Sequence, residues 1–366
     1  MKLSIGREAL LKPLQAVIGV VERRQTMPIL ANVLLNVEKD SLAVTASDLE
    51  VELVARTEPE HVEVPGDITV PGRKLLDICR ALPEGAMIKL SLKGDRLTVQ
   101  SGRSKFVLAT LAAADFPIVD NINADRELKL AKPDLARVLD KTHFSMAQQD
   151  VRYYLNGLLL ETGASKLRGV ATDGHRLALS ELALDQADGV DAQVIVPRKG
   201  VLELQKLLDG DGEVVILLGS NHLRVEIGDI RFTSKLIDGR FPDYERVIPK
   251  TGSNVVTGSR DALRQSLQRA AILSNEKYRG VRLEFEPGKI KIQANNPDHE
   301  EAEDEVEVDY SGDKIEIGFN VNYLLEALGA VDGDDVEISL LDPSSSCIVR
   351  AQGDKDSLYV VMPMRL

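Results

Sequence analysis

The 366-residue chain contains no tryptophan, only 4% aromatic residues and two cysteines, Cys79 and Cys347. Its cores must therefore be filled mainly by aliphatic side chains, and the 43% hydrophobic content is enough to build them. Two cysteines cannot form a disulfide framework, and neither lies in a paired spacing typical of metal ligands. We therefore expect a reducing, cytoplasmic environment.

Long apolar runs are also missing. The N-terminal stretch MKLSIGREALLKPLQ is interrupted by charges every few residues, which is typical of neither a signal peptide nor a membrane span. No later run approaches the length that a membrane-spanning helix needs. The sequence therefore predicts no membrane partner.

A threefold repeat is the strongest pattern in the chain. Similar segments begin at Val70, Val196 and Phe319, and they read VPGRKLLDICRALPEG, VPRKGVLELQKLLDGDG and FNVNYLLEALGAVDGDD. Two more series keep the same order, namely the helix leucines Leu10, Leu135 and Leu263, and the pairs Phe116-Pro117, Phe241-Pro242 and Met362-Pro363. Three independent series in one order indicate three related units.

Each unit has about 120 residues and one plan. A helix opens it, alternating strands follow, a second helix comes near the middle, and more strands close it. Polar breaks near Asp125 and Gly252 predict domains at residues 1–125, 126–252 and 253–366. The fold class that this pattern predicts is α+β, with two helices per unit packed on antiparallel sheets.

The helices show their apolar faces in the sequence. Leu75, Ile78, Cys79 and Leu82 follow at helical spacing in the first unit, so Cys79 is expected in the core rather than as a reactive thiol. Ser259 stands where the third unit's opening helix needs an N-cap.

The net charge of −13 argues against a protein that coats nucleic acid, unless the charge is segregated. The opening-helix regions differ from the rest, because residues 6–24, 132–152 and 260–279 carry +2, +1 and +3. If these helices point the same way, they form one positive surface on an acidic body. The alternative is three ordinary solvated faces.

The whole chain resembles the bacterial DNA polymerase III beta subunit, the sliding clamp. The most specific matches are SMAQQDVRYYLNG, VATDGHRLAL, IVPRKGV, DGRFPDY, AILSNEKYRGVRL and the terminal YVVMPMRL. The resemblance implies a head-to-tail homodimer of six similar domains that encircles double-stranded DNA. It also implies the DNA polymerase III catalytic subunit, the clamp loader, and repair and translesion polymerases as partners.

Simple geometry agrees with a dimer. A compact unit of this size is roughly 30 Å wide, so three units in a ring leave no usable hole, whereas six leave one of roughly 30 Å. That opening is wide enough for a duplex. One chain alone cannot encircle DNA.

Charge at the two ends of the chain suggests how such a ring closes. The third unit carries the acidic run NPDHEEAEDEVEVD, and the first unit carries basic residues beside alternating apolar ones. The candidate interface residues are Lys74, Arg96, Arg103, Lys105, Phe106, Leu108, Ile272, Leu273, Glu300, Glu301, Glu303 and Asp304. A solvated acidic loop stays open as an alternative, and a metal site is disfavoured because no coordination spacing is present.

For DNA contact, the resemblance points to Arg24, Arg73, Gln149, Tyr153 and Tyr154. A clamp must slide, so it should read no base edges and should hold phosphates weakly. The modest positive charge of the opening helices suits that requirement.

The stretch TDGHRLAL, residues 172–179, looks at first like an active site. Comparison of the units matches Asp173 with Asp48 and Asn296, whereas His175 and Arg176 have no basic counterparts. No serine elbow, HExxH, phosphate-cradling glycine loop or paired-cysteine motif accompanies them. We therefore expect no enzyme activity, no cofactor and no metal, and a binding role for His175.

The resemblance supplies that role as a peptide-binding pocket between the second and third units. Its expected residues are Leu155, Thr172, Gly174, His175, Arg176, Leu177, Pro242, Arg246, Val247, Val360, Val361, Met362, Pro363, Met364, Arg365 and Leu366. Methionines and aliphatic side chains give an adaptable surface, with His175 and Arg176 as polar anchors. The run DPSSSC departs from an apolar wall, because it places Ser344 and Ser346 near the pocket.

Two other functions stay open from the sequence. One is a monomeric peptide-binding scaffold that does not encircle DNA. The other is a metal-dependent nuclease that uses the acidic run.

Overall fold

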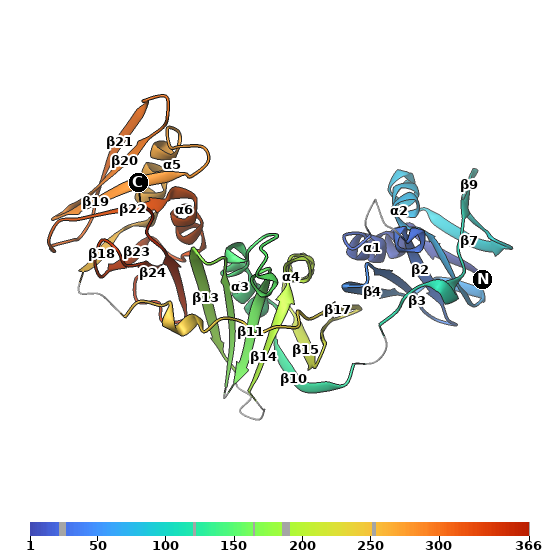
Figure 1. Cartoon of the computed structure of the whole chain (residues 1–366). Helices are drawn as coiled ribbons and strands as arrows, with labels where there is room; N and C mark the ends of the chain where they lie inside the picture. The colour runs from blue at the N-terminus through green and yellow to red at the C-terminus, as the bar shows by residue number, and fades with distance from the viewer. Residues whose placement is uncertain (22–26, 120–121, 164, 185–190, 251–253, 366) are drawn as a thin grey trace. The chain divides into compact units, whose positions relative to one another are not determined.

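The structure, a computed structural model, describes residues 1–21, 27–119, 122–163, 165–184, 191–250 and 254–365. The chain divides into two compact units (Figure 1). Unit 1 comprises Met1–Leu135 and Lys199–Leu236, and unit 2 comprises Ala136–Arg198 and Ile237–Leu366. The middle repeat of the sequence therefore contributes to both units.

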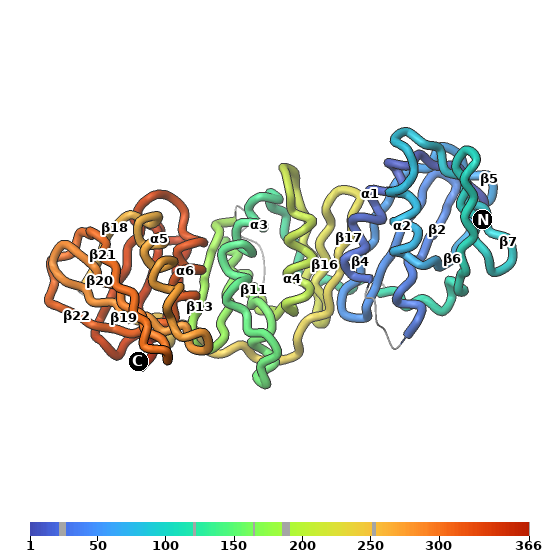
Figure 2. Tube along the Cα trace, turned by 90° about the horizontal axis from the view of Figure 1, so that it is seen from above, coloured from blue at the N-terminus to red at the C-terminus, as the bar shows by residue number. Residues whose placement is uncertain are grey.

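Six α-helices form in the described residues. They are α1 (Arg7–Val17), α2 (Gly72–Ala81), α3 (Lys132–Asp140), α4 (Arg198–Gln205), α5 (Arg260–Ala271) and α6 (Val321–Ala330). Short 3-10 turns are η1 (Pro28–Ala31), η2 (Ala113–Asp115), η3 (His143–Ser145), η4 (Tyr153–Leu155) and η5 (Tyr244–Arg246). Within unit 1, α1 lies beside α2, and within unit 2, α5 lies beside α6 (Figure 2).

The described residues of unit 1 form two antiparallel sheets. Its strands are β1 (Lys2–Gly6), β2 (Asn32–Val37), β3 (Leu42–Ser47), β4 (Val51–Thr57), β5 (His61–Val64), β6 (Gly66–Pro71), β7 (Met87–Lys93), β8 (Arg96–Ser101), β9 (Ser104–Ala109), β10 (Ala124–Ala131), β15 (Glu213–Gly219), β16 (His222–Ile227) and β17 (Ile230–Lys235). The five-stranded sheet has the order β5-β1-β7-β8-β9. The eight-stranded sheet has the order β10-β15-β16-β17-β4-β3-β2-β6 and joins the first and second repeats where β17 pairs with β4.

Two further antiparallel sheets form in the part of unit 2 that the structure describes. Its strands are β11 (Gly157–Gly163), β12 (Lys166–Thr172), β13 (Arg176–Ala183), β14 (Ala192–Pro197), β18 (Asn254–Ser259), β19 (Gly280–Glu286), β20 (Lys289–Asn295), β21 (Glu301–Glu307), β22 (Ile315–Asn320), β23 (Asp335–Leu340), β24 (Cys347–Ala351) and β25 (Ser357–Val361). The eight-stranded sheet, β14-β11-β12-β13-β25-β24-β23-β18, joins the second and third repeats where β13 pairs with β25. The four-stranded sheet has the order β21-β20-β19-β22.

The predicted α+β class with antiparallel sheets is confirmed. The prediction that a helix opens each repeat is wrong, because the strands β1, β10 and β18 precede the three opening helices. The alternation in KLSIG and ADRELKLA carried that signal, and the period of the following helices obscured it. Asp125 lies inside β10, and Gly252 lies outside the described residues, so the domain boundaries stay predictions.

The first residue of the opening helix forms equivalent hydrogen bonds in all three repeats. The first residue of each opening helix donates its backbone N–H to the carbonyl just before the strand that follows the second helix, at 2.8 Å in all three cases. The basic side chain of that residue then binds a carbonyl at the end of the second helix in the first and third repeats, where backbone acceptors lack partners within the helix, and four residues beyond it in the second. These pairs are Arg7 Nε with Cys79 O at 2.9 Å, Lys132 Nζ with Asp209 O at 3.2 Å, and Arg260 Nη1 with Val331 O at 3.0 Å.

The helical face predicted from spacing in α2 is buried except at Ile78, which is half-buried. Leu75 and Cys79 on α2 are fully buried, together with Leu76, and Leu82 lies buried just beyond the helix. Burial raises the pKa of the Cys79 thiol to about 12, which fits a core residue rather than a nucleophile. Ser259 is the N-cap of α5, where its hydroxyl accepts from the backbone N–H of Ala262 at 3.4 Å.

Candidate functional site

The loop of residues 172–176, here called the His175 loop, connects β12 and β13. The Asp173 Oδ1 atom accepts hydrogen bonds from the backbone N–H groups of His175 at 2.9 Å and Arg176 at 3.0 Å. Gly174 has a φ of 88°, a backbone conformation that glycine adopts without strain. The loop geometry therefore follows from the short polar side chain of Asp173 and from the absence of a side chain at Gly174.

A polar residue at the corresponding position shapes the equivalent loop of every repeat. Asp48 Oδ1 accepts from the backbone N–H groups of residues 50 and 51. Asn296 Oδ1 accepts from those of residues 298 and 300. The alignment of Asp173 with Asp48 and Asn296 is thereby confirmed, and the imidazole of His175 is exposed on the second loop.

The C-terminal tail lies directly against the His175 loop. β25 pairs with β13 through residue 361, and the N–H of Met362 then donates to the carbonyl of His175 at 2.9 Å. Beyond Pro363, the N–H of Met364 donates to Gly318 O on β22 at 2.8 Å. Two main-chain hydrogen bonds thus fix the tail between the His175 loop and the edge of the four-stranded sheet.

An apolar floor lies beneath these segments. Leu155, Leu177 and Val360 belong to one buried cluster, which also contains Phe241 and Tyr244. Val361 belongs to a different cluster, the core of the third repeat. Because neighbouring strand residues face opposite sides, Val360 can support the predicted pocket while Val361 packs away from it.

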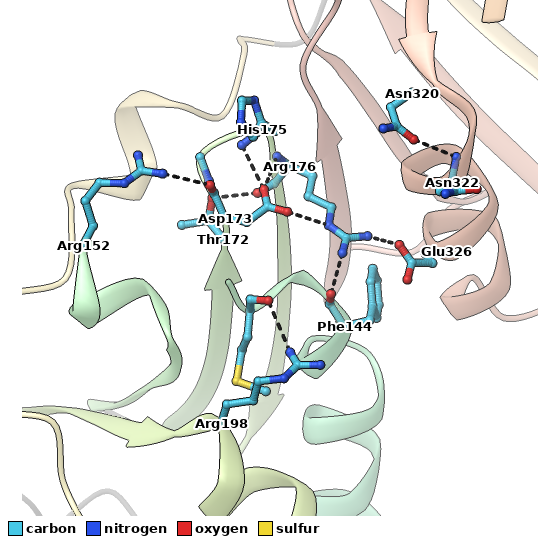
Figure 3. Close-up of polar contacts among 12 residues, drawn as sticks. Phe144, Arg152, Thr172, Asp173, His175, Arg176, Arg198, Asn320, Asn322 and Glu326 are labelled. Atoms are coloured by element: carbon cyan, nitrogen blue, oxygen red, sulfur yellow. Dashed lines mark hydrogen bonds and ion pairs between the residues drawn. The ribbon is translucent and has the colours of Figure 1, made fainter. Parts of the chain in front are cut away.

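Arg176 is engaged within the protein. Its guanidinium donates to Asp173 Oδ2 at 3.1 Å and to the carbonyl of Phe144 at 2.7 Å, and it forms an ion pair with Glu326 on α6 (Figure 3). The ring centroids of Tyr323 and Phe144 lie 4.6 and 5.6 Å from its Cζ atom. Arg176 therefore ties the His175 loop to α6, whereas His175 is the more accessible polar group.

The remaining predicted pocket residues differ in exposure. Thr172 is buried, and its hydroxyl donates to Arg176 O at 2.6 Å. Pro242, Arg246 and Arg365 are exposed, Gly174, Val247, Met362, Pro363 and Met364 are half-buried, and Leu366 lies outside the described residues. Ser344 is exposed and binds Asp342, while Ser346 is half-buried. The pocket itself stays a prediction.

The described DNA candidates belong to different units of the chain. Arg24 lies outside the described residues, and Arg73 is an exposed residue of α2 that donates to Val21 O at 2.7 Å. Gln149, Tyr153 and Tyr154 lie on one loop of unit 2, at residues 149–156, here called the Arg152 loop. Gln149 and Tyr153 are exposed, and Tyr154 packs on the apolar floor.

Many cations of the opening-helix regions serve the fold. Arg7 and Arg260 bind carbonyls at the ends of the second helices, and Lys132 binds Asp209 O, four residues beyond α4. Others form ion pairs, namely Arg137 and Lys141 with Asp332, Arg152 with Asp150, and Arg269 with Asp304. Asp332 and Asp304 lie outside the counted regions, so their ion pairs offset part of the positive charge there, which sequence spacing does not reveal.

The interface candidates lie largely at two sheet edges. β9, with Lys105, is the last strand of the five-stranded sheet, and β21, with Glu301 and Glu303, is the last strand of the four-stranded sheet. Lys74, Arg96, Arg103, Lys105, Ile272, Glu300, Glu301 and Glu303 are exposed, whereas Phe106, Leu273 and Asp304 are half-buried and Leu108 is buried. The sequence reasoning missed Val107, which is 53% exposed on β9. Its position between Phe106 and Leu108 was the available signal, because neighbouring strand residues face opposite sides of the sheet.

The acidic run does not gather a metal site in the described residues. No group of three or more His, Cys, Asp or Glu side chains there could hold an ion. Asp304 pairs with Arg269 at 2.6 Å, which lowers the pKa of that carboxyl, and Glu305 pairs with Lys289 at 2.9 Å. Among all the helices of the described residues, none is long and apolar enough to cross a membrane.

The fold and these sites define a binding protein made of a threefold α+β repeat, with two charged sheet edges and a candidate peptide site. Family models match three consecutive stretches: the DNA polymerase III beta subunit N-terminal domain at residues 1–120, its central domain at 129–243 and its C-terminal domain at 245–365. The chain belongs to the DNA polymerase III beta subunit family.

Individual relatives agree over the full length of both chains. The beta sliding clamp of Pseudomonas putida is 55% identical, and that of Escherichia coli K12 is 51% identical. The crystal structure of the DNA polymerase III subunit beta from Pseudomonas aeruginosa matches with a TM-score of 0.98 at 54% identity, covering all of both chains. A sliding clamp of that organism bound to griselimycin matches with a TM-score of 0.97 at 55% identity over all of both chains. The function is that of a sliding clamp, the non-catalytic processivity subunit of DNA polymerase III.

Proposed function

We propose that two copies of this chain close head to tail around double-stranded DNA and tether DNA polymerase III to it. The observation that carries the proposal is the way the repeats join within the chain. β4 of the first repeat pairs with β17 of the second, and β13 of the second pairs with β25 of the third. By repeat position, β21 corresponds to β4 and β13, and β9 corresponds to β17 and β25.

The third joint of this series would therefore pair β21 of one copy with β9 of another. Both strands are the last in their sheets, and pairing would satisfy their edge hydrogen-bonding groups. The β9 edge is basic, with Arg103 just before the strand and Lys105 on it, and the β21 edge is acidic, with Glu301 and Glu303. The two edges therefore carry opposite charges. Because each chain has one β9 edge and one β21 edge, two copies can form two such joints and close a ring.

The DNA would contact Arg24, Arg73, Gln149, Tyr153 and Tyr154 without base-specific hydrogen bonds. The pairing of many helix cations within the fold keeps phosphate binding weak, as sliding requires. We further propose a cytoplasmic location, where such a clamp would meet chromosomal DNA.

The catalytic subunit of DNA polymerase III, the clamp loader, and repair and translesion polymerases would dock through short peptides at the His175 loop and the C-terminal tail. The apolar floor with Val360 and the exposed imidazole of His175 support this role. The three repeats are proposed as domains at residues 1–125, 126–252 and 253–366.

Primer extension tests the function. With clamp loader, ATP and DNA polymerase III present, adding this chain should lengthen the product made in a single binding event by the polymerase. A control reaction without the loader should show no such gain. Product lengths unchanged by the chain in the complete reaction would refute the proposal.

A further inference from the structure

Tyr244 of η5 is attached to the eight-stranded sheet of unit 2 in two ways. Its ring belongs to the apolar floor together with Leu159 and Val170, and the residue is only 6% exposed. Its hydroxyl donates a hydrogen bond to Glu161 Oε2 and accepts one from Arg168 Nη1 at 2.7 Å. The phenol therefore uses both its donor and its acceptor, and the side chain is fixed at its tip as well as along its ring.

The strand pairing explains how one side chain reaches both apolar and polar partners. Directly opposed residues on neighbouring strands point to the same face of a sheet, and so do residues two positions apart on one strand. An apolar row across β14, β11, β12 and β13 consists of Ile195, Leu159, Val170 and Leu179. A polar row, two positions along each strand, consists of Gln193, Glu161, Arg168 and Glu181. Tyr244 lies across both rows, because its ring packs on the first and its hydroxyl binds the second.

The polar row is held in place by its own contacts. Arg168 donates from Nε and Nη2 to Glu181 Oε2, at 3.0 and 2.8 Å. Gln193 Nε2 donates to Glu161 Oε1 at 2.5 Å. Burial and the hydrogen bond to Glu161 raise the pKa of the Tyr244 phenol to about 12, so the hydroxyl remains a donor at neutral pH. The tyrosine is therefore bound by groups whose positions are already fixed.

The segment of residues 241–248, here called the Tyr244 segment, has no main-chain hydrogen bond to the sheet within the described residues. Its main-chain hydrogen bond there is internal, from the Val247 N–H to Tyr244 O at 2.9 Å. The Glu245 carboxylate lies 3.7 Å from Arg168, but its side chain is 74% exposed, so solvent screens this ion pair. The phenol is therefore the main polar anchor of the segment.

This anchor is specific to the second repeat. The corresponding position of the first repeat, three residues after Phe116, is Val119, and that of the third repeat, three residues after Met362, is Arg365. The polar row is also replaced in the first repeat, where the opposed residues are Asn36, Ala43 and Arg56. Like the pair at residues 175–176, the tyrosine anchor therefore exceeds what the fold of a repeat requires, and it occurs beside the candidate peptide site.

We propose that Tyr244 is a positioning residue of the partner-peptide site, and that its hydroxyl holds the Tyr244 segment against the sheet as a wall of that site. The segment carries the predicted pocket residues Pro242, Arg246 and Val247. The inference rests on the proposed function, because it assumes that a peptide binds beside His175 and this segment. The hydroxyl does not contact the peptide itself. A wall that is fixed in advance loses less conformational entropy when the peptide binds, so the anchor raises affinity.

The test compares Tyr244→Phe with the unchanged chain, because this substitution removes the hydroxyl and keeps the ring. The probe is a fluorescein-labelled peptide from the clamp-binding segment of the DNA polymerase III catalytic subunit, measured by fluorescence anisotropy. Tyr244→Phe should weaken binding about threefold to tenfold. Tyr310→Phe is the matched control and should leave the affinity unchanged, because Tyr310 is also buried in unit 2 and its hydroxyl donates to Asp313 O at 2.6 Å. Equal affinities of Tyr244→Phe and the unchanged chain would overturn the proposal.

Amide hydrogen exchange separates positioning from other roles of the tyrosine. In the free protein, Tyr244→Phe should speed exchange at the Val247 N–H and leave the amides of β11 and β12 unchanged, whereas Tyr310→Phe should not affect Val247. Weaker peptide binding with unaltered exchange at Val247 would mean that the hydroxyl touches the peptide, and would overturn the proposal. Faster exchange throughout unit 2 would mean that the hydroxyl stabilises the whole fold, and would overturn it as well.

Substitutions of Glu161 give a second, independent test. Glu161→Ala removes the acceptor of the phenol and should weaken peptide binding, whereas Glu161→Gln keeps an acceptor oxygen and should restore part of the loss. In a chain that already carries Tyr244→Phe, Glu161→Ala should cost little more, because the hydrogen bond is gone. Strictly additive losses would contradict the anchor.

The same peptide assay distinguishes failure of this inference from failure of the proposed function. If His175→Ala and the unchanged chain bind the peptide equally well, the peptide site of the proposed function fails. If His175→Ala weakens binding and Tyr244→Phe does not, the positioning role alone fails.

Discussion

The backbone N–H of Met362 donates a hydrogen bond to the carbonyl oxygen of His175 at 2.9 Å. This contact joins two segments that stand 187 positions apart in the sequence. It continues the pairing of β25 with β13 by one residue. The histidine of TDGHRLAL is therefore next to the tail that the sequence reasoning assigned to the same pocket.

His175→Ala should weaken the binding of the polymerase peptide by about tenfold or more, as truncation of an interface hot spot does. Removing residues 364–366 in addition should bring the loss to several kcal/mol, because Met364 would no longer anchor the tail to Gly318. Fluorescence anisotropy gives both values. The mass of the dimer should stay the same, and an unaltered peptide affinity would refute the pocket assignment.

Charge reversal at β9 and the turn that precedes it should break the proposed dimer. Arg103→Glu with Lys105→Glu places acidic residues opposite Glu301 and Glu303, so native mass spectrometry at micromolar concentration should show a monomer. Lys89→Glu with Lys93→Glu makes the same charge change on the interior strand β7 and should leave the dimer intact. Adding Glu301→Lys and Glu303→Lys to the β9 variant should restore dimers. An unchanged chain that is monomeric at this concentration would favour the peptide-binding scaffold instead.

The two cysteines should be inert in the folded protein. Burial raises the pKa of Cys79 and of Cys347 to about 12, so neither is a thiolate at pH 8. A chromogenic disulfide reagent should modify no thiol before unfolding and two after it. Because an unfolded thiol has a pKa of about 8.5, the neutral thiols stabilise the fold fully below that pH, and this stabilisation declines as pH rises toward 12. Rapid labelling of the native chain would contradict the burial.

Loss of a helix-capping cation should lower stability without changing peptide binding. Arg260→Met removes the hydrogen bond to Val331 O and should reduce the free energy of unfolding by about 1 kcal/mol. Urea unfolding followed by circular dichroism measures the effect. The control Arg282→Met, which breaks an exposed ion pair, should change stability by less than about 0.5 kcal/mol. Equal effects from both variants would argue against the capping role.

Much of the architecture could be predicted because repetition multiplies a weak signal. The spacing around Cys79 gave the buried face of α2, and the match of Asp173 with Asp48 and Asn296 gave the shape of three loops. Local side-chain hydrogen bonding explains that success, since each polar residue acts within five positions of itself.

Other parts depend on partners far away in the sequence. Arg176 meets Glu326 and Phe144 only after β13 and α6 are folded, so its role in holding the loop carried no sequence signal. The bonds that Arg7 and Arg260 form carried no sequence signal for the same reason, because both side chains bind backbone carbonyls at the ends of the second helices. Carbonyl acceptors exist at every residue, so spacing alone does not identify which one a cation will reach.

The most direct measurement of the ring is retention on DNA of different topology. The chain is loaded by the clamp loader onto a nicked circular plasmid, the complex is separated from free protein by gel filtration, and half of it is then cut once with a restriction enzyme. A closed ring should stay on the circle and slip off the linear molecule through its ends. Equal retention on circular and linear DNA would contradict the claim that the protein encircles the duplex.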